Sequence, residues 1–159
     1  MLFRSILSYR NSGIAGAAGN TGSGITMGGV KGGMIERSVA YDNGWLCDAN
    51  EGPVGIWTYD SYGVVIQHNE LYRNRTNGPA DGGDFDLDQN TRNALVQYNY
   101  SHDNYGPGYL FSHSPNTFSH SGNTVRYNIS ENDGRRNSAA AILIWGVRST
   151  RRSTTTACT

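Results

Sequence analysis

The sequence repeats one phrase five times, each copy about thirty residues after the last. The phrase runs apolar residue, two spacers, Asn or a substitute, one spacer, a small or apolar residue, two spacers, and Asn or Asp. The copies occupy residues 3–11, 35–43, 64–74, 94–104 and 124–133. The interval narrows slowly, from 32 residues between Asn11 and Asn43 to 29 between Asn104 and Asp133. Self-similarity at a nearly fixed period indicates a repeat architecture.

Each period also contains a second short apolar stretch. These stretches lie at residues 24–27, 55–58, 84–88, 109–111 and 141–145. They are rich in β-forming residues and bounded by Gly, Asn, Asp or Pro, which predicts strands. No segment has a sustained apolar period of 3.6 residues, so we expect no helix longer than a turn.

A unit of two or three short strands cannot bury its apolar face alone. Stacked units pair each strand in parallel with its equivalent one coil away, which predicts a solenoid. The interior would hold an aliphatic ladder of Ile35, Ile66, Val96 and Val125. A turn would hold a ladder of Asn69, Asn99 and Asn128, since Asn tolerates left-handed dihedrals and bonds local backbone groups. We predict one all-β domain of about five coils, near residues 1–33, 34–63, 64–93, 94–122 and 123–146.

The repeated phrase, V-x-I-x-x-N-x-x-x-x-N in its clearest copy at residues 64–74, resembles that of the right-handed parallel β-helix proteins, the pectate-lyase-like group. The resemblance extends through Gly146 and implies a right-handed single-stranded parallel β-helix. Proteins with that fold include lyases, glycosidases, esterases, epimerases, adhesins and phage tailspikes. A carbohydrate-active function is therefore one of several that the resemblance implies. It also implies a secreted or cell-surface parent protein.

The two ends lack the features expected of a complete solenoid. No amphipathic helix precedes the first coil, although terminal repeats are usually capped. Residues 147–159 have neither the phrase nor an apolar period, which predicts a disordered tail. We interpret the chain as a fragment of a longer β-helix whose tail is read out of frame. No signal-peptide core follows Met1, so any export signal would lie outside this chain.

Composition excludes several partners. The formal net charge is zero and no basic stripe exists, which disfavours nucleic acid and acidic membranes. No window approaches the ~18 apolar residues of a membrane span.

The two cysteines, Cys47 and Cys158, do not form a disulfide framework. The oligomeric state stays open.

The strongest candidate site is the acidic strand at residues 84–88. Alternation in a strand would place Phe85 and Leu87 inward and Asp84, Asp86 and Asp88 outward. Their spacing of about 6.6 Å along the strand lies near the ~6.5–9.5 Å between the carboxyl groups of inverting glycosidases. Crowded carboxylates raise one another's pKa, as a general acid requires, or bind a hard cation such as Ca²⁺. Three interpretations stay open: a solvated outer face, a calcium or substrate site, and a catalytic site.

Neighbouring coils supply candidate supporting residues. If Gly55, Gly83 and Gly108 are equivalent, the acidic strand is flanked by aromatic, acidic and histidine side chains. His113 would be an acid or electrostatic partner in catalysis. Arg92 would bind a uronate carboxylate, or cap a turn through Asp88 or Asp60. The substrate-binding candidates are Asp60, Tyr59, Arg92, Tyr109 and Phe111.

Two histidines that could be mistaken for catalytic or metal-binding residues belong to the repeat. His68 aligns with Tyr98, and His102 aligns with Tyr72, so both are expected to be stacked structural residues. The Gly-rich stretch at 13–33 lacks the Gly-Lys-Ser/Thr of a phosphate loop. The resemblance to the β-helix proteins, together with the acidic strand, implies a polysaccharide lyase or glycoside hydrolase domain acting on an extracellular polymer, and a uronate-containing polymer is one choice. The alternative is a non-catalytic adhesin or carbohydrate-binding β-helix. No cofactor other than Ca²⁺ is implied.

Overall fold

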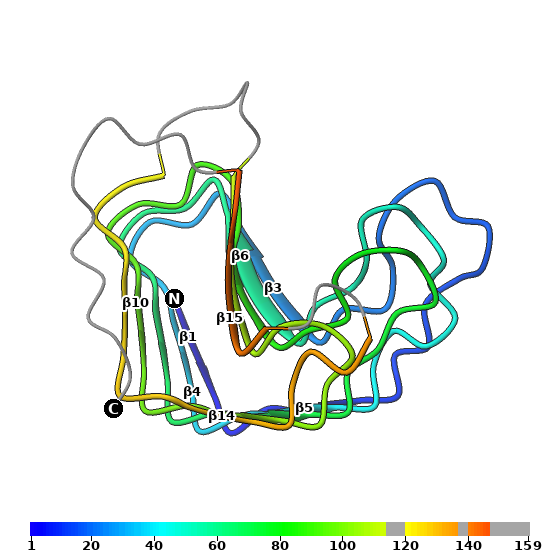
Figure 1. Ribbon diagram of the computed structural model, residues 1–159. Helices are drawn as coiled ribbons and strands as arrows, with labels where there is room; N and C mark the ends of the chain where they lie inside the picture. The colour runs from blue at the N-terminus through cyan, green and yellow to red at the C-terminus, as the bar shows by residue number, and fades with distance from the viewer. Residues whose placement is uncertain (114–119, 137–139, 147–159) are drawn as a thin grey trace.

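The computed structural model describes residues 1–113, 120–136 and 140–146, and over these residues the chain is a parallel solenoid of fifteen short strands with no helix. Viewed along the solenoid axis, successive coils superpose on one another (Figure 1). The predicted disordered tail, 147–159, lies outside the described residues. In the described part of the chain no helix has the length and hydropathy needed to cross a membrane.

Every coil contributes one strand to each of three five-stranded parallel sheets. The first sheet contains β1 (Leu2–Arg4), β4 (Met34–Glu36), β7 (Val65–Gln67), β10 (Leu95–Gln97) and β13 (Thr124–Arg126). The second contains β2 (Leu7–Tyr9), β5 (Val39–Tyr41), β8 (Glu70–Tyr72), β11 (Tyr100–His102) and β14 (Ile129–Glu131). The third contains β3 (Ile25–Gly28), β6 (Ile56–Tyr59), β9 (Phe85–Leu87), β12 (Tyr109–Ser112) and β15 (Ile142–Trp145).

The chain makes about four full turns, from β1 to β13, followed by the arc through β14 and β15. The expectation of about five coils counted that incomplete arc as a coil. The parallel all-β architecture without long helices is confirmed.

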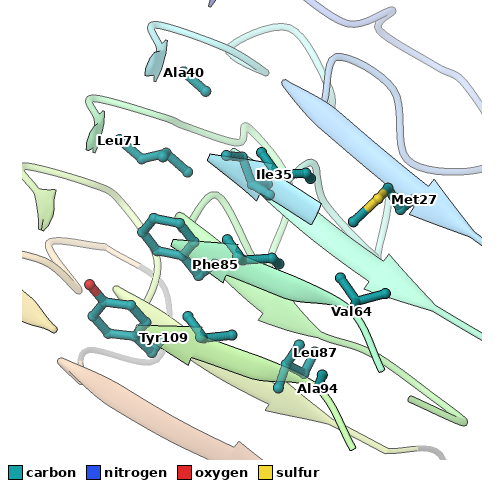
Figure 2. Packing of buried hydrophobic residues seen from close by; sticks show 12 residues of the cluster. Met27, Ile35, Ala40, Val64, Leu71, Phe85, Leu87, Ala94 and Tyr109 are labelled. Carbon is teal, nitrogen blue, oxygen red and sulfur yellow. The ribbon is translucent and has the colours of Figure 1, made fainter. Parts of the chain in front are cut away.

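The core lies between the sheets and is built from columns of equivalent side chains. The predicted aliphatic ladder is confirmed, because Ile35 pairs with Ile66, Ile66 with Val96, and Val96 with Val125. Across from it, the rings of Phe85 and Tyr109 stack with centroids 5.1 Å apart (Figure 2). Burial of these columns supplies the main favourable free energy of folding.

The Asn ladder at the first turn is also confirmed. Asn99 Nδ2 donates to Asn128 Oδ1 at 3.0 Å and to the Ile66 carbonyl at 2.9 Å, while Asn99 Oδ1 accepts the Asn69 N–H at 2.9 Å. Each amide therefore satisfies backbone groups that a sharp bend leaves without a sheet partner. The left-handed residue is the one before the Asn, such as Tyr98 with φ 55°, and not the Asn itself.

A second ladder follows the strands of the second sheet and runs through Asn11, Asn43, Asn74, Asn104 and Asp133. In it, Asn43 Nδ2 donates to Asn74 Oδ1 at 2.9 Å, and the Asn74 N–H donates to Asn104 Oδ1 at 2.8 Å.

Aromatic stacks run beside both ladders. His68 stacks on Tyr98 and His102 on Tyr72, with centroids 5.2 and 4.9 Å apart, which confirms the expected structural role of both histidines.

Loops between the second and third sheets project to one side of the solenoid and are coloured blue to green in Figure 1. They occupy residues 10–24, 42–55, 73–84 and 103–108, with 15, 14, 12 and 6 residues, and ten residues, 132–141, separate β14 from β15. These loops stand beside the outer face of the third sheet, where the candidate site lies.

We expect Asn99→Ala to lower the free energy of unfolding by about 2–4 kcal/mol, because it leaves the buried Asn69 N–H and Ile66 carbonyl without their partner. Urea unfolding measures the change. Asn77→Ala, which truncates an exposed Asn in a loop, is the matched control and should cost less than about 0.5 kcal/mol. Equal losses in the two variants would contradict a structural role for the ladder.

Candidate functional site

A groove of about 610 Å³ lies between the outer face of the third sheet and the projecting loops. Its floor comes from β6, β9, β12 and β15, and its wall from residues near 20, 50–52 and 79–81. The volume falls within the ~300–1,000 Å³ range of small-molecule sites. The residues that matter for chemistry here are Glu51, Trp57, Asp81, Asp86, Asp88, His113 and Trp145.

The acidic strand meets the groove in a register that differs by one residue from the expected one. Ile56 pairs with Phe85 and Phe85 with Tyr109, so Gly55 is equivalent to Asp84 and not to Gly83. A shift of one residue exchanges the two faces of a strand. The outward column is therefore Trp57, Asp86 and Leu110.

The outward orientation predicted for Asp84 is wrong. Its side chain is fully buried, and it accepts hydrogen bonds from Asn74 Nδ2 at 2.7 Å, Ser101 Oγ at 2.7 Å and Asn104 Nδ2 at 2.6 Å. Burial, followed by the charge of Asp133, raises its pKa well above the ordinary value. Asp84 thus joins the second Asn ladder inside the solenoid, away from the groove.

Tyr109 and Phe111 also point inward, which corrects their expected place in a substrate site. Tyr109 is 2% exposed, and its hydroxyl lies 3.0 Å from the Ile129 carbonyl and 3.1 Å from that of Asn99. Phe111 is partly buried and packs against the core. Both belong to the inner columns of the third sheet, where alternate residues face the interior.

Three other predicted binding residues do not line the groove. Tyr59 stacks on Trp57, with centroids 5.0 Å apart. Asp60 accepts a hydrogen bond from Asn90 Nδ2 at 3.0 Å, and Arg92 Nη2 donates to Asn90 Oδ1 at 2.8 Å. Arg92 therefore contacts the turn at Asn90, and contact of these residues with a ligand stays a prediction.

Asp86 and Asp88 do line the groove, as expected, and so does His113. Asp86 is only 5% exposed, and its Oδ1 is buried without a hydrogen-bond partner among the described residues. Burial, then the charges of Asp88 and Asp81, raises its pKa well above the ordinary value, although the Ser112 N–H donates to it. Burial thus favours the neutral form of this carboxyl group, and one of its oxygens is available for a further hydrogen bond.

Asp81 completes the acidic group and was not among the predicted site residues. Burial raises its pKa to about 6, against the effect of the Gly52 N–H, which donates to Asp81 Oδ2 at 2.8 Å. Asp88 is less deeply enclosed; burial raises its pKa too, while the Gln89 N–H donates to Asp88 Oδ1 at 2.6 Å. The charge of Asp88 also raises the pKa of Asp81 and of Asp86, and burial raises the three pKa values to different extents.

Two tryptophans lie at the two ends of this acidic group. Trp57 belongs to β6 and Trp145 to β15, three strands apart, which corresponds to about 14 Å at ~4.8 Å per strand. Trp145 is 63% exposed. Large apolar ring faces beside carboxyl groups suit a ligand that combines C–H faces with polar edges.

The predicted calcium ligands are not gathered at one point, because Asp84 faces the interior while Asp86 and Asp88 face the groove. Over the described residues, no group of three or more His, Cys, Asp or Glu could hold a metal ion. Calcium binding stays a prediction.

We expect Asp81→Asn to stabilise the protein by about 1–3 kcal/mol at pH 8 and to have little effect at pH 4. The pKa of Asp81 rises from 3.8 to about 6 on folding, so the wild type loses stability as the pH rises through this window. Urea unfolding at both pH values checks this, with Asp48→Asn, at an exposed loop residue, as the control. A gain that is the same at pH 4 and pH 8 would count against a buried, proton-binding Asp81.

Comparison with known proteins gives a relative and a family. The chain is 37% identical over 83 residues to a lacto-N-biosidase of Bifidobacterium longum subsp. longum, a match that covers 50% of this chain and 5% of that protein. No solved structure matches the chain. A family model described as the right handed beta helix region matches residues 4–156. With this match and the parallel solenoid described above, the chain belongs to the right-handed β-helix family.

Proposed function

We propose that this domain hydrolyses a glycosidic bond in an extracellular glycan and that the groove on the third sheet is its active site. The observation that carries the proposal is the set of three carboxyl groups with raised pKa values, Asp81, Asp86 and Asp88, between two tryptophans. Glycoside hydrolysis by most enzymes requires one protonated and one ionised carboxyl group beside the scissile bond.

The differences among the three acids suggest their roles. Asp81 is the general acid, because a pKa of about 6 keeps it protonated in mildly acidic solution yet able to release the proton. It protonates the glycosidic oxygen as the bond to the sugar carbon breaks. Asp88, the least enclosed acid, acts in its ionised form and activates the water or attacks the sugar carbon. Asp86 stays neutral and donates a hydrogen bond to the sugar.

Two further observations favour hydrolysis over elimination. Of the described residues that line the groove, none is Lys or Arg, so the basic side chain that lyases of this fold commonly use as their base has no candidate there. The partial relative is named as a lacto-N-biosidase, a glycoside hydrolase. Family and relative together support a carbohydrate-related function and an extracellular location.

A panel of neutral and uronate-containing oligosaccharides tests the proposal, with reducing ends and ultraviolet absorbance measured together. We expect reducing ends without an unsaturated product. Asp81→Asn and Asp88→Asn should each lower kcat/KM by about 10²–10⁴-fold, with Asp48→Asn as the matched control outside the groove. An unsaturated product would identify a lyase, and saturable binding without turnover would identify a carbohydrate-binding β-helix. An added chelator tests the calcium prediction in the same assay.

The pH dependence is a second test of the assigned roles. We expect kcat/KM to fall as the pH rises above about 6, because Asp81 then loses the proton that it must donate. It should also fall at low pH, where Asp88 becomes protonated. A profile that keeps rising from pH 6 to pH 9 would exclude Asp81 as the general acid.

A further inference from the structure

A second hollow, of about 440 Å³, shares no lining residue with the groove. It is lined by Arg10, Asp42, Trp45 and Arg75. Arg10 and Asp42 follow β2 and β5 at equivalent turns of successive coils, both with left-handed backbone. Trp45 and Arg75 come from the loops that follow the second Asn ladder. The solenoid thus stacks these residues into one surface site by the same coil-to-coil register that builds the core.

Positive charge is in excess at this hollow. Arg73 Nε and Nη2 donate to Asp42 Oδ1 and Oδ2 at 2.9 and 3.0 Å, so the carboxylate already has a bidentate partner. These hydrogen bonds lower the pKa of Asp42, and the charges of Arg75 and Arg10 lower it further. Three guanidinium groups therefore surround one carboxylate, and Arg10 and Arg75 retain charge to attract another anion.

Arg75 has an unused donor. Its Nε is buried and has no hydrogen-bond partner among the described residues, while its guanidinium carbon lies 5.4 Å from the centroid of the Tyr105 ring. The ring holds the guanidinium plane in place by a cation–π interaction. A buried N–H without a partner is unfavourable, and a ligand oxygen that reached it would supply the missing acceptor.

Trp45 gives the hollow an apolar side. Trp45 is 39% exposed and lines the hollow together with Arg10 and Arg75. The basic character is local, since the chain has no net charge, which disfavours a long polyanion such as nucleic acid. We propose that this hollow binds an acidic sugar, with Arg10 and Arg75 on its carboxylate and Trp45 against its ring. The hollow shares no lining residue with the groove, so binding of the acidic sugar does not depend on catalysis in the groove.

Isothermal titration of the chain with trigalacturonate, and with its methyl ester as the uncharged match, tests the proposal. We expect saturable binding of the acid, weakened about tenfold to a hundredfold by esterification, by Arg10→Gln and by Trp45→Ala. Arg37→Gln is the control, since Arg37 is an exposed arginine with the same left-handed backbone at a turn outside the hollow. Arg75→Gln, checked for folding by thermal unfolding, should weaken binding by a similar factor.

Equal affinity for acid and ester, wild-type binding by Arg10→Gln, or no saturable binding at millimolar ligand would each overturn the proposal. Inorganic phosphate binding as tightly as trigalacturonate would show a bare anion site and overturn recognition of the sugar. Asp88→Asn separates this site from the groove, because it should lower kcat/KM by the factor expected above while leaving the affinity for trigalacturonate unchanged. Loss of both functions in that variant would contradict two separate sites.

Discussion

The hydrogen bond from one asparagine side chain to the next coil is the interaction on which the rest of the structure depends. A solenoid must turn sharply between sheets, and each bend leaves backbone groups that no strand partner can reach. The Asn69, Asn99 and Asn128 amides satisfy these groups and at the same time join neighbouring coils. They therefore fix the register in which every other column, aliphatic, aromatic or charged, is stacked.

The same constraint explains what the sequence could predict. The recurring phrase contains both the ladder and the buried aliphatic positions, so the parallel architecture, the Ile35 to Val125 column and the stacked His68 and His102 all followed from it. The third sheet was harder to predict, because Asp84 takes the position that Gly55 and Gly108 occupy in neighbouring coils. Aligning glycine with glycine displaced the neighbouring strands by one residue relative to β9, which reversed the predicted faces of Tyr109 and Phe111. Asp84 was predicted wrongly for another reason: it precedes β9, at a bend where the alternation of a strand does not apply.

The candidate site was only half predictable for a related reason. Asp86 and Asp88 lie on or beside a strand, where alternation places them on the outer face. Asp81 and Glu51 lie in loops outside the repeated phrase, where no periodicity indicates which way a side chain points. Their contribution comes from the stacking of successive loops, which brings residues some thirty positions apart to one wall. Asp81 starts the acidic run at 81–88, and that position was the one available signal.

The projecting loops differ in length from coil to coil, although the strands beneath them do not follow that variation. The loops at residues 42–55 and 73–84 are long and the loop at 103–108 is short, whereas every strand of the groove floor has three or four residues. A linear ligand lying along the axis would therefore meet a higher wall beside the two long loops than beside residues 103–108. Because strand pairing does not depend on loop length, the height of this wall can change by insertion or deletion without disturbing the floor. The repeat thus separates what holds the protein together from what shapes the groove.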